Sequence, residues 1–124
     1  GTVVAAVPAP ASGQVAAENA TIASVTQAFA AGTLTCRRLV AGYLARIAAF
    51  DDQGPALNAL IAVHPGALDA ADAMDAAYRR DRTAVGPLHC VPVILKDNFD
   101  TADLPTTGGS RALANSQPAR DAFT

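Results

Sequence analysis

The chain has 124 residues, which is enough for one modest hydrophobic core and too few for two full domains. Hydrophobic residues make up 51% of the chain and aromatic residues only 5%, which favours helices packed through small side chains over an aromatic-rich β-sandwich. The net charge is −2 and no stretch concentrates lysine and arginine, which argues against a nucleic-acid-binding surface.

The first 18 residues differ in composition from the rest. They are mostly alanine, valine and proline, and Ala9-Pro10-Ala11 matches the A-x-A pattern of a signal-peptide cleavage site. We interpret residues 1–18 as a flexible leader or signal-peptide remnant, and residues 19–124 as the folded part. This predicts an exported protein, in the bacterial periplasm or secreted. The alternatives are a cytoplasmic protein and an extension without a role in the fold. No segment has the eighteen apolar residues of a membrane span.

Two helices are predicted in the first half of the chain. Ser24 and Gln27 fit a capping box that starts a short helix at Ser24, and Gly32 is suited to ending it. Thr35 then fits the N-cap of a second helix that runs to about Phe50. One buried face of this second helix is predicted from residues at helical spacing: Leu39, Val40, Tyr43, Leu44, Ile47 and Phe50.

A strand and a third helix are predicted next, after a loop at residues 51–55. Residues 57–63 are short and apolar and fit a strand, and Pro65 fits the first turn of a helix over residues 66–80. Asp75 and Arg79 have the spacing of an ion pair on that helix. Three carboxylates on the same helix are interpreted as a solvated face rather than a metal site: Asp69, Asp72 and Asp75.

Lys96 closes an apolar run, residues 91–95, that is typical of a buried strand. An ammonium in such a place loses its water, which lowers its pKa and lets it act as a base. Spacing alone favours the alternative, in which the lysine ends the strand and points into solvent. From Asp97 onward the chain is rich in turns.

The other side chains that could react or bind a metal give weaker sequence patterns. Cys36 and Cys90 lie 54 residues apart without a CxxC or Cys/His ligand spacing, so we predict no metal site and favour two buried free thiols over a disulfide. His64 and His89 have no convincing local nucleophile. Cys90 is adjacent to His89, but neighbours on an extended chain point to opposite faces. Residues 108–110, Gly-Gly-Ser, lack the G-x-S-x-G frame and are interpreted as a loop.

Residues 86–98, with the sequence GPLHCVPVILKDN, resemble a motif of the amidase signature family. The family pattern is G-P-L-H-G-[IV]-P, three hydrophobic residues and K-D-N, followed by a T-T-x-G-S segment that residues 106–110 resemble. Four further segments match the family's usual layout: Gly32–Thr35, Leu57–Ala59, Ala71–Asp75 and Arg120–Phe123. The resemblance covers about residues 20–124.

The resemblance implies an α/β fold, a mixed sheet flanked by helices, of which this chain holds the N-terminal helices and first strands. It also implies a hydrolase that cleaves carboxamides through a Ser–cis-Ser–Lys triad and an acyl-enzyme. Lys96 corresponds to the triad lysine, which hydrogen-bonds a serine that relays the proton of the nucleophilic serine. No cofactor and no metal are implied.

Two departures from the family pattern limit what this chain is expected to do alone. Cys90 stands where the family usually has glycine. The G-G-S-S-G-G-S segment with both triad serines lies outside these 124 residues, and residues 108–110 do not replace it. We therefore expect an inactive chain that needs a second polypeptide or a further segment.

The expected substrate is a small amide or a peptide amide, as for bacterial peptide amidases and aryl acylamidases. The alternatives are a non-catalytic binding fragment and a glutamine-hydrolysing amidotransferase subunit.

Overall fold

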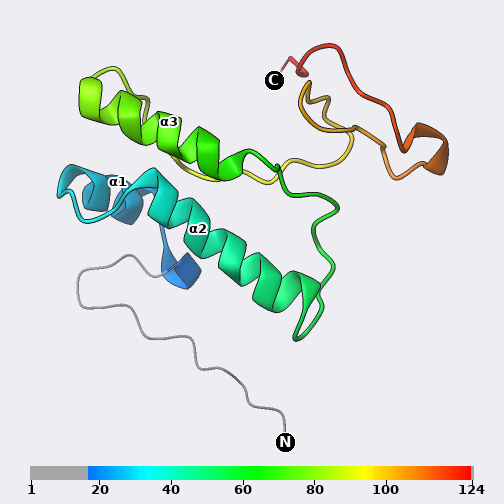
Figure 1. The fold of residues 1–124 in the computed structure, drawn as a ribbon, viewed down its shortest axis with the longest axis horizontal. Coiled ribbons are helices and arrows are strands. Elements are labelled where there is room, and N and C mark those ends of the chain that lie inside the picture. The colour runs from blue at the N-terminus through cyan, green and yellow to red at the C-terminus, as the bar shows by residue number, and fades with distance from the viewer. Residues whose placement is uncertain (1–16, 124) are drawn as a thin grey trace, which may run out of the picture.

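The computed structural model describes residues 17–123, which form three α-helices and a long irregular C-terminal segment (Figure 1). None of the described helices is long and apolar enough to cross a membrane. The predicted leader lies outside the described residues except for its last two positions, so its boundary stays a prediction. The elements in chain order are η1 (Ala17–Asn19), α1 (Ile22–Ala30), α2 (Cys36–Ile47), η2 (Ala48–Asp52), α3 (Ala67–Arg80) and η3 (Arg111–Leu113).

The helix α1 begins earlier than the sequence pattern predicted. Thr21 is the N-cap: its hydroxyl accepts a hydrogen bond from the Ser24 amide at 3.0 Å, and the Ser24 hydroxyl accepts one from the Thr21 amide at 2.9 Å. Ser24 therefore ends the capping box, at helix position N3, and does not start it, because its hydroxyl serves as the returning acceptor usually supplied by Glu or Gln. Gly32 follows the helix with φ +70°, the left-handed conformation predicted for it.

The helix α2 starts where predicted and continues into a wider turn. The Thr35 hydroxyl accepts a hydrogen bond from the Arg38 amide at 3.1 Å, which confirms Thr35 as the N-cap. After Ile47 the chain continues as the π-helical turn η2. There the buried Asp51 carboxylate accepts hydrogen bonds from the amides of Ala59 and Leu60, at 2.6 and 3.2 Å.

These bonds explain why the predicted strand at residues 57–63 does not form. Asp51 takes backbone donors that a sheet ladder would need. Ala56 and Asn58 have φ values of +50° and +49°, which bend the chain out of the extended conformation. The apolar run is therefore an irregular loop that leaves Ile61 76% exposed.

The helix α3 packs against α2, and one of its carboxylates caps that helix. Both oxygens of Asp75 accept backbone hydrogen bonds at the start of α2, from the Cys36 amide at 2.8 Å and the Arg37 amide at 3.1 Å. The predicted pairing of Asp75 with Arg79 is wrong because Asp75 is buried and faces α2, where free helix amides need an acceptor. Arg37 forms its ion pair with Asp72.

The core lies where the three helices meet the segment after residue 86. Its buried members are Val25, Phe29, Cys36, Leu39, Ala71 and Cys90. Residues 97–123 extend away from the helices (Figure 1). In residues 17–123 the β-pairing is limited to a single bridge between Thr101 and Leu104, so the mixed sheet expected for the complete fold stays a prediction.

Candidate active-site segment

Lys96 is exposed in this structure, together with most of the apolar run that precedes it. Residues 91–95 lie outside regular secondary structure, and Ile94 is 79% exposed. The predicted strand therefore does not form in this chain, and the exposed lysine agrees with the alternative that spacing alone favoured, in which it points into solvent. The physical reason is that a central strand is buried by neighbouring strands and helices, which residues 17–123 do not supply.

A turn follows Lys96 and presents Asp97 to the next loop. The Phe99 amide donates to the Lys96 carbonyl at 3.0 Å, which closes the turn. The Asp97 carboxylate accepts hydrogen bonds from the Thr107 amide at 2.9 Å, from the Thr107 hydroxyl, and from the Gly109 amide at 3.2 Å. The Thr107 hydroxyl bond, followed by the Thr107 amide bond, lowers the pKa of Asp97 below its ordinary value.

The loop at residues 106–110 is thereby fixed beside the lysine. The Gly108 amide donates to the Asp97 carbonyl at 2.8 Å. Gly108 and Gly109 have φ values of +56° and +74°, and glycine adopts such values without the steric cost of a side chain. Ser110 lies at the exposed end of this loop, as its sequence context predicted. Asp97, the residue after Lys96, thus holds the loop of residues 106–110 in one conformation.

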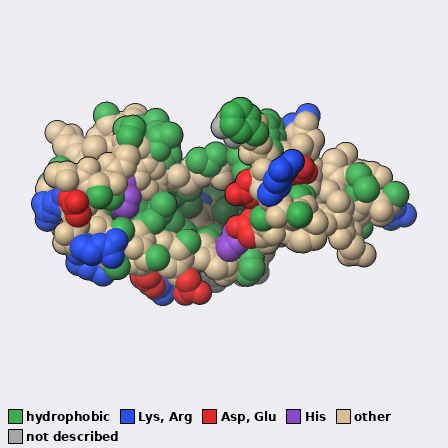
Figure 2. All heavy atoms as spheres, turned by 90° about the horizontal axis from the view of Figure 1, so that it is seen from above, with side chains coloured by type: hydrophobic (Ala, Val, Ile, Leu, Met, Phe, Trp, Pro, Cys, Tyr) green, Lys and Arg blue, Asp and Glu red, His purple; other side chains and the backbone are tan. Residues whose placement is uncertain are grey.

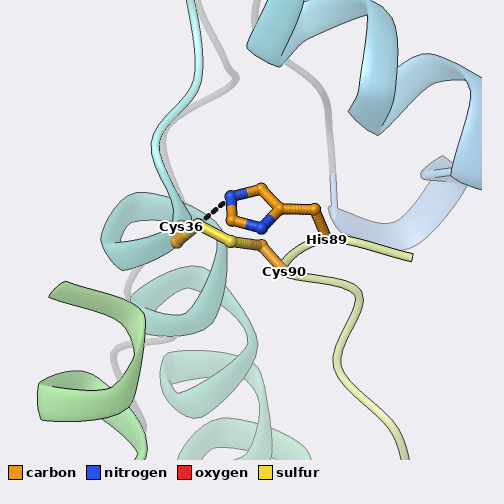
Figure 3. A group of neighbouring side chains, drawn as sticks. All are labelled: Cys36, His89 and Cys90. Carbon is orange, nitrogen blue, oxygen red and sulfur yellow. Dashed lines mark hydrogen bonds between the residues drawn. A yellow bond between two sulfur atoms is a disulfide. The ribbon is translucent and has the colours of Figure 1, made fainter. Parts of the chain in front are cut away.

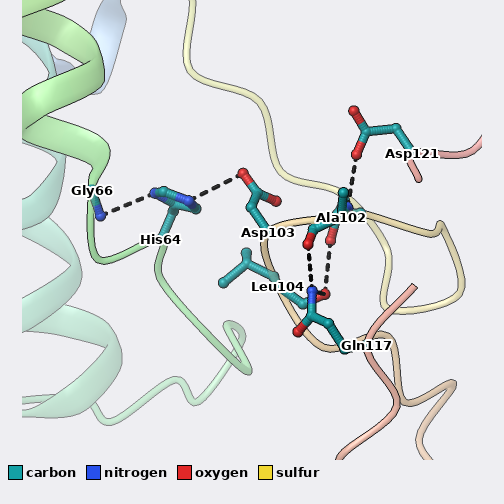
Figure 4. Close-up of polar contacts among 8 residues, drawn as sticks. His64, Gly66, Ala102, Asp103, Leu104, Gln117 and Asp121 are labelled. Carbon is teal, nitrogen blue, oxygen red and sulfur yellow. Dashed lines mark hydrogen bonds and ion pairs between the residues drawn. The ribbon is translucent and has the colours of Figure 1, made fainter. Parts of the chain in front are cut away.

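His64 links the start of α3 to the C-terminal segment (Figure 4). Its Nδ1 accepts a hydrogen bond from the Gly66 amide at 3.0 Å, and its Nε2 lies 3.1 Å from the Asp103 carboxylate. This arrangement places the imidazole proton on Nε2 in the neutral ring. The His64–Asp103 pair thus ties the two segments together.

Further polar contacts hold the C-terminal segment to itself. The Gln117 side-chain amide donates to the carbonyls of Ala102 and Leu104, and the Asp121 carboxylate accepts from the Ala102 amide at 2.8 Å (Figure 4). These bonds close a loop that begins at Ala102 and returns at Asp121.

Cys36 and Cys90 form a disulfide, with Cα atoms 5.4 Å apart (Figure 3). The preference for free thiols was wrong, whereas the predicted burial is confirmed, with 0% and 5% exposure. Residues 87–90 form a turn, and Cys90 has φ +59°. His89 and Cys90 therefore both reach Cys36, contrary to the expectation for an extended chain. A glycine would adopt the left-handed φ of this position without the steric cost of a side chain.

Sequence reasoning missed the cluster of Cys36, His89 and Cys90. Cys36 is 53 and 54 residues away from the other two, and ligand-spacing rules apply to residues on one local turn or hairpin. The one local signal was a cysteine in place of a glycine.

Comparisons with known proteins match most of the chain to amidases. The family model described as Amidase matches residues 38–124. A probable amidase of Arabidopsis thaliana is 42% identical over 107 residues, covering 85% of this chain and 20% of that protein. A glutamyl-tRNA(Gln) amidotransferase subunit of Chloroflexus aurantiacus is 38% identical over 103 residues, covering 82% of this chain and 20% of that protein.

Solved structures of amidases also match the chain. The peptide amidase of Stenotrophomonas maltophilia matches with a TM-score of 0.76 and 41% identity, over 83% of this chain and 21% of that one. An amidase family protein of Bacillus anthracis matches with the same TM-score and 32% identity, over 83% of this chain and 20% of that one. The described fold thus matches part of an amidase fold.

The chain belongs to the amidase family. It spans about one fifth of the length of the relatives it matches.

Proposed function

We propose that this chain supplies the lysine base of an amidase that hydrolyses carboxamides through an acyl-enzyme. The observation that carries the proposal is the placement of Lys96 between the apolar run and the Asp97-bound loop at residues 106–110. The run has the sequence of a buried strand and is exposed here, so a covering segment would remove water from the lysine. Loss of water favours the neutral amine, the form that accepts a proton.

The two serines of the triad would come from a second polypeptide or from a further segment of the same protein. Support comes from the exposed apolar residues beside Lys96 and from the fraction of its relatives that the chain spans. Water-exposed apolar surface of this kind is stabilised by burial. We therefore propose that the isolated chain is inactive.

The proposed substrate is a small amide or a peptide amide. The identity of 41% with a peptide amidase supports this choice. A second candidate is glutamine hydrolysis in an amidotransferase, which the 38% identity with the Chloroflexus protein supports. Assays of ammonia release from a peptide amide and from glutamine by the assembled protein separate the two.

We further propose that the protein is exported. The Cys36–Cys90 disulfide supports this, because disulfides persist mainly in oxidising compartments. Recovery of the native protein from the periplasm or the medium with both cysteines oxidised is the expected result. Recovery from the cytoplasm with both cysteines reduced would contradict it.

Replacement of Lys96 tests the proposed function. In the assembled protein, Lys96→Ala should lower the rate of amide hydrolysis by about 10²–10⁴, the usual contribution of a general base. Lys96→Arg should fail as well, because a guanidinium does not release its proton near neutral pH. Circular dichroism and complex formation serve as folding controls. Near-normal turnover by a well-folded Lys96→Ala protein would instead favour a non-catalytic role for this segment.

A further inference from the structure

Three side chains with metal-binding atoms meet in the core, at the start of α2 (Figure 3). The sulfur atoms of Cys36 and Cys90 and a ring nitrogen of His89 all lie within 4.8 Å of one another. We propose that this cluster is a redox-gated metal site: the disulfide closes it, and after reduction the two thiolates and the imidazole bind a thiophilic ion of the Zn²⁺ type. The proposal is independent of the proposed amidase activity.

The geometry of the nitrogen ligand already fits. His89 Nε2 lies 3.5 Å from Cys36 Sγ. A tetrahedral zinc ion with Zn–S of about 2.3 Å and Zn–N of about 2.0–2.1 Å holds its nitrogen and sulfur ligands about 3.6 Å apart. The imidazole therefore does not need to move relative to Cys36 for both to reach one ion.

A further sulfur stands beside the cluster. Met74 Sδ lies 3.8 Å from Cys90 Sγ, and two sulfur ligands on one tetrahedral zinc are about 3.8 Å apart. Met74 is partly exposed, so the same place is open to a water molecule as the fourth ligand. Thiolate, imidazole and thioether together form a soft ligand set, which selects zinc and other thiophilic ions over Mg²⁺ and Ca²⁺.

The surroundings favour the ligand forms of these groups. Cys36 is the first residue of α2, and the positive end of a helix stabilises a thiolate, whereas the Asp75 carboxylate bound to the Cys36 amide acts in the opposite direction. The His89 ring contacts two aromatic rings, with its centroid 5.3 Å from that of Tyr78, on which it stacks, and 5.8 Å from that of Phe29, which it meets edge-on. The two cysteines are buried, so a bound ion would be shielded from water on their side and open to it only beside Met74.

Reduction of the disulfide opens the site. A thiol or phosphine reductant supplies two electrons, the S–S bond breaks, and each sulfur takes up one proton. Metal binding then releases both protons, because the ligands are thiolates. The sulfur atoms must separate to about 3.8 Å, so the disulfide and the bound ion exclude each other. In the oxidising compartment proposed above the disulfide keeps the site closed, and the site opens only where a reductant reaches the disulfide.

Cobalt binding tests the proposal directly. The full protein is reduced with a phosphine under anaerobic conditions and titrated with Co²⁺, a spectroscopic substitute for Zn²⁺. We expect one equivalent to bind with thiolate-to-cobalt charge-transfer absorption in the near ultraviolet, and Zn²⁺ to displace it. The oxidised protein and the Cys36→Ser variant should lack this absorption. Its absence from folded, reduced wild type, or its persistence in Cys36→Ser, would overturn the proposal.

A second measurement tests the proposal if the protein unfolds when its disulfide is reduced. If the reduced protein unfolds, Zn²⁺ should restore helical circular dichroism, since binding to the native state stabilises it. Failure of Zn²⁺ to restore the fold would overturn the proposal. His89→Phe is the matched control because it keeps the aromatic stack and removes the nitrogen. It should weaken binding by at least about 10-fold, and unchanged affinity would exclude His89 as a ligand.

Discussion

Among single residues, Asp97 has the greatest influence on the segment around Lys96. Its carboxylate accepts hydrogen bonds from Thr107 and Gly109, so one side chain holds the loop of residues 106–110 next to the lysine. Bonds from backbone amides to a carboxylate are charge-assisted and short, which favours a single loop geometry. Asp97 is therefore a positioning residue.

Asp97→Asn should loosen the loop without unfolding the helices. The amide side chain lacks the charge, and its NH₂ group cannot accept a hydrogen bond from Thr107. We expect hydrogen exchange at Thr107 and Gly109 to accelerate on the order of ten-fold, with exchange in α2 unchanged. Asp100→Asn removes the same charge three residues away and serves as the control. Equal protection of the loop in wild type and Asp97→Asn would contradict the assignment.

The same carboxylate predicts an acid transition of the loop. Because hydrogen bonding lowers the pKa of Asp97, its stabilising contribution is complete above the ordinary value of 3.8 and is lost as the pH falls through the folded-state value. Protection of Thr107 should be constant between about pH 7 and pH 5 and should fall below about pH 4. In Asp97→Asn this acid limb should be missing. If protection of Thr107 falls at the same pH in both proteins, another group causes the acid transition.

Cys90 gives a residue-scale prediction about backbone strain. Its φ of +59° is costly for a residue with a side chain and free for glycine. Cys90→Gly and Cys90→Ala both remove the disulfide, but the glycine variant should be more stable by about 1 kcal/mol in urea unfolding. Equal stabilities would show that position 90 leaves the left-handed conformation once the disulfide is absent.

The sequence points to Lys96 through a contiguous motif, and the role of this lysine stays a prediction. Its neighbour Asp97 binds a loop only ten residues away, and contacts between residues so close in the chain are accessible to sequence reasoning. The partnership of Cys36 with His89 and Cys90 could not be predicted, because the tertiary packing of α2 against a distant turn creates it.

At the scale of elements, α2 is held in place from two directions at its first turn. Thr35 caps it from within the chain, and Asp75 of α3 accepts the amides of Cys36 and Arg37. The disulfide adds a covalent link from the same turn to the segment that leads to Lys96. The position of that segment therefore depends on how α2 and α3 pack.

Asp75→Ala should destabilise this junction. It leaves buried backbone amides without their acceptor, which costs about 1–3 kcal/mol. Asp72→Ala is the matched control on the same helix, since it removes an exposed ion pair with Arg37 and should cost no more than about 1 kcal/mol. Urea unfolding of both variants measures the difference. A larger loss for Asp72→Ala than for Asp75→Ala would contradict the capping role.

The helices could be predicted and the strands could not, for one reason. A helix satisfies its own backbone, so caps and 3.6-residue spacing located α2 and α3 closely. A strand is satisfied by other strands, so residues 57–63 instead use Asp51 as an acceptor and residues 91–95 stay outside any ladder.

At the scale of the whole molecule, the described chain has a small core and much exposed apolar surface. Figure 2 shows hydrophobic side chains around the recess between the helices and the C-terminal segment. Val93, Ile94 and Leu95 are more than half exposed. Surface of this kind marks an interaction site, and the proposed occupant is the remainder of the amidase fold.

The exposed surface predicts how the isolated chain behaves. The purified 124-residue chain should self-associate in light scattering, and Ile94→Asp should reduce this association because it places a charge in the apolar run. Arg80→Ala, on the exposed end of α3, changes the net charge by the same one unit and serves as the control. A monomeric wild-type chain with cooperative unfolding would contradict the need for a complement.

Our central proposal is that this chain contributes a base and that another segment contributes the serines. The most direct measurement is ammonia release from a peptide amide by the chain alone, by the chain with its complementary segment, and by that assembly carrying Lys96→Ala. We expect full release by the wild-type assembly, none by the isolated chain, and release slower by about 10²–10⁴ in the Lys96→Ala assembly. Hydrolysis by the isolated chain, or equal rates for the two assemblies, would contradict the proposal.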